Sequence, residues 1–230
     1  MQKCAEIKKR ESKAEHIAKL NLLAFERDFL SKGKSLIAGM DEAGRGPLAG
    51  PVVVACVCMP LSDQDIIKGV YDSKQLSPSL RDSLYQEIIK KAIEYSVSII
   101  DNTTIDQINI LNATKKGMKE CINAFKSNCD MVLVDAVKLM DTKIDTLPII
   151  KGDALSYSIA AASIIAKVTR DRIMEEYDLV FPQYGFCRHK GYATPEHISA
   201  LKTYGACPLH RKSFIKNFFL EQTDIFEKSF

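Results

Sequence analysis

Short apolar runs, typical of buried β-strands, alternate along this chain with longer segments whose apolar residues recur at helical spacing. We expect strands at residues 35–40, 51–59, 96–100, 131–134 and 147–150, and helices at 14–30, 78–95, 109–126 and 155–177. Ser77 before Pro78 is a favourable helix start, because serine caps free backbone amides and proline suits the first turn. Strands that alternate with helices predict an α/β sheet domain.

The chain changes character after residue 180. Aromatic and basic residues become frequent, no strand pattern is evident, and Pro182, Gly185 and Gly191 are turn signals. We therefore expect a helical appendage there. The predicted organisation is a lead-in with a helix at 1–30, a catalytic sheet domain at 31–180 and a helical region at 181–230.

Composition places the chain among ordinary globular proteins, with 46% hydrophobic and 27% charged residues in 230. The net charge of +3 and the pI of about 8.4 support nucleic-acid binding only weakly, because such charge must be clustered to matter. Seven cysteines without a CxxC pair favour a reducing compartment. No apolar run is long enough to span a bilayer. We expect a cytoplasmic, soluble protein that is a monomer and binds no membrane.

Four acidic residues stand at or just beyond the ends of predicted strands. Asp41 and Glu42 follow an apolar run, Asp135 follows Met-Val-Leu-Val, and Asp153 precedes a helix. Strand ends are where sites assemble in α/β sheets. Clustered carboxylates repel one another unless a cation neutralises them, and Mg²⁺ prefers oxygen ligands. The pattern predicts a divalent-metal site, and two ions about 4 Å apart would suit phosphodiester hydrolysis.

Each acid also has a purely structural interpretation. Asp153 could cap the helix that follows it, and Asp135 could serve a turn. Asp41 and Glu42 are neighbours, and neighbours in a regular strand point to opposite faces. They can share one site only where the backbone departs from the pleat, which Gly44 and Gly46 make easier.

Seven stretches occur in an order that resembles the type 2 ribonuclease H family, in particular its bacterial ribonuclease HII branch. They are DEAGRGPLAGPVVVA (41–55), DSKQLS (72–77), INILNAT (108–114), VLVDAVKL (132–139), KGDALSYSIAAASIIAKVTRD (151–171), HKGYATPEH (189–197) and HRKSF (210–214). The resemblance covers residues from about 36 to 214. GRG rather than GKG favours ribonuclease HII over ribonuclease HIII. Ala136 departs from the family, which usually has glycine there, and so does Cys187-Arg188, which replaces a small residue and a lysine.

The resemblance implies a ribonuclease-H-like mixed sheet flanked by helices, with a helical C-terminal appendage. It implies endonucleolytic cleavage of RNA in RNA–DNA hybrids and of single ribonucleotides embedded in duplex DNA. Cuts would fall on the 5′ side of the ribonucleotide and leave 3′-hydroxyl and 5′-phosphate ends. The acids matching the family's metal ligands are Asp41, Glu42, Asp135 and Asp153, and the expected cofactors are two Mg²⁺ or Mn²⁺ ions.

Substrate contacts are expected from two further groups of residues. Gly44, Arg45 and Gly46 can bring backbone groups close to a 2′-hydroxyl, the feature that distinguishes RNA from DNA. By resemblance, Tyr192 packs on the sugar beside the scissile phosphate; alternatively it is half-buried between the appendage and the sheet. The candidate phosphate contacts are Lys74, Lys190, His189, His210 and Arg211, although surface lysines are often merely solvated. For the C-terminal histidines we favour structural or phosphate-contact functions over zinc.

The stretch QTDIF, from Gln222 to Phe226, resembles peptides by which bacterial replication proteins dock on the sliding clamp. An amphipathic terminal helix covering the core is the alternative. For the whole protein, the expected partners are RNA–DNA hybrids and ribonucleotide-containing duplex DNA. Two other functions compete with nuclease activity: a hybrid-binding protein without catalysis, and a transposase-like strand transferase acting on plain DNA.

Overall fold

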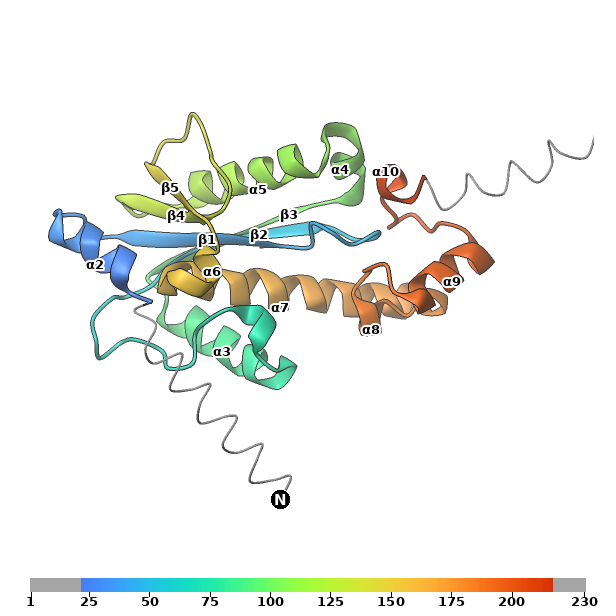
Figure 1. The fold of residues 1–230 in the computed structure, drawn as a ribbon, viewed down its shortest axis with the longest axis horizontal. Coiled ribbons are helices and arrows are strands. Elements are labelled where there is room, and N and C mark those ends of the chain that lie inside the picture. The colour runs from blue at the N-terminus through green and yellow to red at the C-terminus, as the bar shows by residue number, and fades with distance from the viewer. Residues whose placement is uncertain (1–21, 217–230) are drawn as a thin grey trace, which may run out of the picture. The chain divides into compact units, whose positions relative to one another are not determined.

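The computed structural model describes residues 22–216, and its strands form a five-stranded sheet in the order β3-β2-β1-β4-β5 (Figure 1). β1 runs parallel to β4, with Ile37 opposite Met131, and β4 runs parallel to β5, with Val132 opposite Thr146. The strands are β1 Ile37–Ala43, β2 Val52–Cys58, β3 Glu94–Ile100, β4 Met131–Asp135 and β5 Thr146–Ile149.

Helices flank this sheet and make up most of the C-terminal part of the described chain. They are α2 Ala24–Ser31, α3 Pro78–Lys91, α4 Asn102–Ile108, α5 Ile110–Ala124, α6 Gly152–Leu155, α7 Tyr157–Val180, α8 Phe186–His189, α9 Pro195–Tyr204 and α10 Lys212–Ile215, with 3₁₀ turns at Ser73–Gln75 and Pro182–Tyr184. The predicted α/β class and the helical C-terminal region are confirmed. Within residues 22–216, no helix has the length and apolar character that crossing a membrane requires.

The chain divides into two compact units. The first comprises Met1–Asp41, Cys56–Tyr95 and Phe125–Ile164, and the second comprises Glu42–Ala55, Ser96–Ala124 and Ile165–Phe230. The three ranges expected from the sequence, 1–30, 31–180 and 181–230, stay a prediction.

The first unit is built around the parallel strands β1, β4 and β5. Its core cluster joins residues of these strands to Ile159 in α7, and α2 packs against it: Ile37, Met131, Leu133, Ile149 and Ile159, with Phe25, Phe29, Leu30, Leu61 and Leu147 partly buried around them. The predicted cap of α3 is confirmed, since the Ser77 side chain accepts a hydrogen bond of 3.3 Å from the Leu80 amide. Burial of this shared apolar face fixes where the ends of β1 and β4 lie.

The described residues of the second unit include small apolar clusters. One groups Ala49, Met174, Tyr184 and Phe186, the next groups Val52, Ile100, Ile105 and Ala113, and another groups Leu48, Leu201 and Ile215. The helix expected at 109–126 is α5, and Asn109, at φ 63°, separates it from α4, a helix that the sequence analysis did not predict. The Asn109 side chain then caps α5 by accepting from the Asn112 amide at 3.0 Å. An asparagine tolerates this left-handed conformation better than most residues.

Candidate active site

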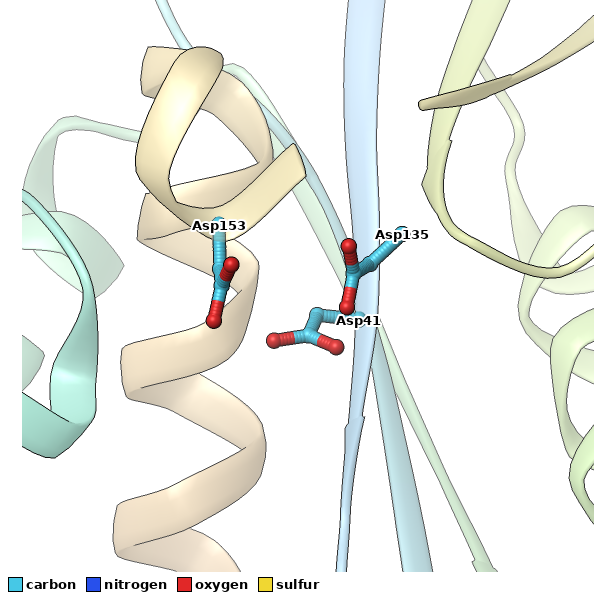
Figure 2. A group of neighbouring side chains, drawn as sticks. All are labelled: Asp41, Asp135 and Asp153. Carbon is cyan, nitrogen blue, oxygen red and sulfur yellow. The ribbon is translucent and has the colours of Figure 1, made fainter. Parts of the chain in front are cut away.

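Three of the predicted acids lie together in the first unit. Asp41 comes from β1, Asp135 from the end of β4 and Asp153 from the short helix α6, and Figure 2 shows their carboxylates pointing toward one another. Each offers a ligand oxygen, and these atoms all lie within 4.8 Å of one another. Asp41 and Asp153 are buried and Asp135 is half-buried. Parallel pairing of β1 and β4 explains part of this convergence, because it brings their carboxyl ends to one edge.

The backbone between β5 and α6 places Asp153. Oδ1 of Asp135 accepts a hydrogen bond of 2.7 Å from the Gly152 amide, and the Ala136 amide donates to the Ile149 carbonyl at 3.0 Å. The turn into α6 passes through Lys151 in a left-handed conformation, φ 58°. Asp153 therefore directly follows Gly152, the residue whose amide is bonded to Asp135. The N-cap position of α6 is occupied by Lys151, so Asp153 is not simply a helix cap.

A glycine in β1 allows the start of α7 to approach this edge. A Cβ atom on Gly39 would overlap the backbone of Ser158 and Ile159. Only a residue without a side chain fits under the helix there. Gly39 stands two residues before Asp41, so the close approach brings the α6–α7 region near the acidic strand end.

The three carboxylates form a region of concentrated negative charge. Burial is the main cause that raises the pKa of Asp135, and the Asp153 charge adds to it, while the hydrogen bond from Gly152 and the Lys74 charge oppose the rise. Nζ of Lys74 lies 3.0 Å from Oδ2 of Asp153. Burial lowers the pKa of Lys74, but its hydrogen bond to Asp153 and the charges of Asp153 and Asp41 outweigh burial, so the net pKa is raised. The raised pKa of Lys74 shows that the carboxylates favour a positive charge beside them.

This donor set fits a hard divalent cation. Carboxylate oxygens are the ligands that Mg²⁺ and Mn²⁺ prefer, and three of them converge within 4.8 Å on a strand edge. The ammonium of Lys74, held at one of these carboxylates, shows that a cation is stabilised at this place. Asp41, Asp135 and Asp153 are therefore the residues that would hold a metal.

Glu42 lies outside the group of acids found among the described residues. β1 continues through Asp41 and Glu42 to Ala43, longer than predicted, and side chains alternate between faces in such a strand. Oε1 of Glu42 instead accepts a hydrogen bond of 3.2 Å from Arg45. That Glu42 is a fourth metal ligand stays a prediction.

In the second unit, two buried arginines hold the loop that contains Gly44, Arg45 and Gly46. Arg211 donates to the carbonyls of Gly44 at 2.6 Å, Arg45 at 2.9 Å, Gly50 at 3.0 Å and Pro51 at 3.1 Å. Arg170 donates to Pro51 at 3.0 Å, Ala49 at 3.2 Å and Lys190 at 3.0 Å. Burial lowers the pKa of both guanidinium groups, that of Arg211 to about 9. The loop conformation is thus determined by side chains distant in sequence.

Tyr192 lies beside this loop with 44% of its surface exposed. The Arg170 guanidinium is 5.9 Å from the ring centroid, and the ring atom Cε1 would be 3.8 Å from a Cβ placed on Gly46. Arg45 and Gly46 are exposed while Gly44 is buried, with φ 95°. The aromatic face and the glycine loop therefore adjoin one another, as a contact to one sugar would require.

The other candidate phosphate contacts differ in exposure. The Lys74 side chain is largely exposed, whereas Lys190 bonds to Glu175 at 2.8 Å. His189, His210 and Arg211 are buried, at 9%, 2% and 0% exposure. His210 and His197 share a hydrogen bond of 3.1 Å between their Nε2 atoms, and Nδ1 of His197 bonds to the Tyr192 carbonyl at 2.9 Å. Of these buried residues, Arg211 bonds directly to the loop, to the carbonyls of Gly44 and Arg45.

The sequence did not single out Arg170 and His197 as part of these arrangements. Nor did it single out Glu26 of the first unit, whose Oε1 accepts hydrogen bonds from the Ser156 hydroxyl and the Ser158 amide. Arg170 and His197 lay inside quoted motifs, but nothing local distinguishes a buried arginine or histidine from an exposed one. Glu26 stood on the amphipathic pattern of the N-terminal helix, and a helical wheel would have flagged an acid on its buried face.

The family model and the curated relatives that match this chain carry the same description. A family model described as Ribonuclease HII matches residues 38–217. Ribonuclease HII of Ruminiclostridium cellulolyticum is 56% identical over 197 residues, covering 86% of this chain and 76% of that protein. Ribonuclease HII of Acetivibrio thermocellus is 54% identical over 200 residues, covering 86% of this chain and 77% of that protein.

Solved structures show the same fold. Ribonuclease H2 from Pyrococcus horikoshii superposes with a TM-score of 0.68 at 27% identity, covering 81% of this chain and all of the other. The Archaeoglobus fulgidus RNase HII from a PCNA:RNase HII complex gives a TM-score of 0.67 at 30% identity, covering 77% of this chain and 94% of that one.

Proposed function

The chain belongs to the ribonuclease HII family and is a ribonuclease H endonuclease, and from this premise we propose its detailed reaction. It hydrolyses the RNA strand of RNA–DNA hybrids and nicks duplex DNA on the 5′ side of embedded ribonucleotides. The products are 3′-hydroxyl and 5′-phosphate ends. The convergence of Asp41, Asp135 and Asp153 within 4.8 Å is the observation that carries the proposal.

The cofactors proposed are two divalent ions, Mg²⁺ or Mn²⁺. When bound, they lower the pKa of a water molecule and stabilise charge on the phosphoryl and leaving oxygens. Asp41, Asp135 and Asp153 hold them, with Glu42 as the proposed fourth ligand. Lys74 is exposed and bonded to Asp153, which supports the proposal that it contacts a phosphate of the substrate near the acids.

Recognition of the ribose is proposed for the loop with Gly44, Arg45 and Gly46. Since the carbonyls of Gly44 and Arg45 already accept from Arg211, the loop would present its amide groups to the 2′-hydroxyl. The exposed Tyr192 would stack on the sugar. A site that pairs with a hydroxyl rejects the deoxy sugar, because buried polar groups are otherwise left unpaired.

A cleavage assay on matched duplexes tests the proposal. One 20-mer duplex carries a single ribonucleotide and the other is all DNA, each with and without chelator. Metal-dependent cutting of the first alone, with 3′-hydroxyl and 5′-phosphate ends, is expected. Equal cutting of both would support a strand transferase or general nuclease instead. Binding without cutting would support the non-catalytic alternative, and Asp153→Asn should bind hybrid but not cleave it.

Docking on a sliding clamp through residues 222–226 stays a prediction, because these residues lie outside those that the structure describes. The Archaeoglobus fulgidus relative was solved in a complex with PCNA. A pull-down with purified clamp would compare the full chain with one truncated after Leu220. Equal binding by the two would remove the prediction.

A further inference from the structure

A buried carboxylate in α2 is bonded to the beginning of α7. Oε1 of Glu26 accepts a hydrogen bond of 2.6 Å from the Ser156 hydroxyl and one of 2.9 Å from the Ser158 amide. Glu26, Ser156 and Ser158 are all fully buried. The Tyr157 amide also donates to the Leu22 carbonyl, at 2.8 Å. Leu22 and Glu26 therefore accept hydrogen bonds from the amides of Tyr157 and Ser158, which have no partner within α7 because they lie in its first turn.

The Ser156 side chain links Glu26 to the first turn of α7. Its Oγ donates to Glu26 and accepts from the Ile159 amide at 3.2 Å, so that it caps α7 while being held itself. A carboxylate at the N-terminus of a 24-residue helix is also favoured by the helix dipole. Glu26 thus fixes both the direction and the position of the first turn of α7.

The same junction is continuous with the acidic site. The Ser156 amide donates to the Gly152 carbonyl at 2.8 Å, and the Gly152 amide donates to Asp135 at 2.7 Å. Asp153 lies inside this short bonded segment. On its other side, the backbone of Ser158 is in contact with Gly39 of β1. A shift at Ser156 would therefore change the distance from Asp153 to the other two acids.

We propose that Glu26 is a positioning residue of the metal site: it holds the α6–α7 junction so that Asp153 meets Asp41 and Asp135 at ligand distance. Glu26 touches neither metal nor substrate, and it precedes residues 38–217, the part matched by the family model. The inference rests on the proposed metal-binding function of the three acids.

The test is direct Mn²⁺ binding by isothermal titration calorimetry on the metal-free full chain. Glu26→Ala removes the acceptor and should weaken Mn²⁺ binding about ten-fold, as loss of groups that orient metal ligands commonly does. Glu26→Gln keeps a carbonyl oxygen for Ser156 and Ser158, and should bind within about three-fold of wild type. In cleavage assays, Glu26→Ala should need more metal while kcat at saturating metal changes little.

A matched control separates positioning from general stability. Leu30→Ala alters the same helix, where the apolar Leu30 side chain packs on the core and can take no part in the hydrogen bonds of the junction. It should lower the melting temperature and leave Mn²⁺ affinity unchanged. All variants are compared at a temperature where circular dichroism shows them folded. If Glu26→Ala does not fold, Ser156→Ala removes one of the two bonds to Glu26, and a loss of about three-fold is expected.

A double-mutant cycle tests whether Glu26 acts through Asp153. In an Asp153→Asn background, Glu26→Ala should cause no further loss of Mn²⁺ affinity. The inference is overturned if folded Glu26→Ala binds Mn²⁺ like wild type, or if its loss is undiminished in that background. Wild-type protein that neither binds Mn²⁺ nor cleaves the ribonucleotide duplex would instead overturn the proposed function, and this inference with it.

Discussion

The backbone amide of Gly152 donates a 2.7 Å hydrogen bond to Oδ1 of Asp135, and Asp153 follows Gly152 directly in the chain. One bond therefore holds the segment that carries Asp153 next to Asp135, although Gly152 stands 17 residues after Asp135. The bond also partly offsets the repulsion between them, because an amide donor stabilises the ionised form of Asp135.

Replacing Asp135 separates metal binding from folding. Asp135→Asn keeps an oxygen for the Gly152 amide but loses the charge. Because burial raises the pKa of Asp135, ionising it costs stability near neutral pH, and metal-free Asp135→Asn should unfold at the same or a higher urea concentration. Cleavage should fall by roughly a hundred-fold or more. Retained cleavage in the folded variant would contradict the assignment of Asp135.

Gly39→Ala should be strongly destabilising, because the new methyl would overlap the backbone at Ser158 and Ile159. Backbone cannot rotate away as a flexible side chain can, so we expect a loss of roughly 3 kcal/mol or more in the free energy of unfolding. Urea denaturation measures it. A loss below about 1 kcal/mol would show that α7 approaches β1 less closely.

Gly46→Ala should separate substrate contact from stability. Its φ is not positive, and the nearest atom to an added Cβ, Cε1 of Tyr192, would be 3.8 Å away, so the free energy of unfolding should change by no more than about 0.5 kcal/mol. If the substrate backbone approaches here, the methyl should lower kcat/KM on the ribonucleotide duplex by about ten-fold or more. Unchanged kcat/KM would exclude close approach at Gly46.

Ala136→Gly should stabilise the protein. Ala136 has φ 50°, a left-handed conformation that costs an alanine about 1–2 kcal/mol. Glycine loses more chain entropy on folding, so the net gain should be about 0.5–1 kcal/mol. Asp141→Gly is the matched control at φ 57°, where a smaller gain is expected because aspartate tolerates this conformation. A lower melting temperature for Ala136→Gly than for wild type would show that the left-handed conformation of Ala136 does not destabilise the protein.

Stability should fall between about pH 6.5 and pH 4 through His210. Its pKa is lowered from 6.5 to about 4, mainly by burial and also by the charge of the neighbouring His197, while a hydrogen bond with the Cys207 backbone opposes the lowering. In this window the unfolded chain binds a proton at His210 that the folded protein does not, so unfolding becomes more favourable as pH falls. The contribution is on the order of 2–3 kcal/mol and is complete below about pH 4.

Urea denaturation of wild type and His210→Gln across this range measures the effect. The variant should lose less stability than wild type on acidification, so the two curves should converge toward pH 4. Parallel curves would show that His210 is not the group responsible.

The sequence alone determined the local elements and the identity of the acids. The strand before Asp41, the strand before Asp135 and the Ser77 cap of α3 follow from short-range patterns, and a short-range pattern depends only on neighbouring residues. The ordered motifs indicated the family in the same way, because each motif is a contiguous stretch that can be read without knowledge of the fold.

Tertiary structure decided how these residues act together. It placed Asp135 on the Gly152 amide and left Glu42 bonded to Arg45. Arg211, expected from the sequence as a phosphate contact, is buried and donates to the Gly44 carbonyl. The tertiary structure also brought Glu26 to Ser156, which stands 130 residues later. Such pairings depend on packing between segments that are remote in sequence, because buried polar groups bond to whichever partners the core brings near them.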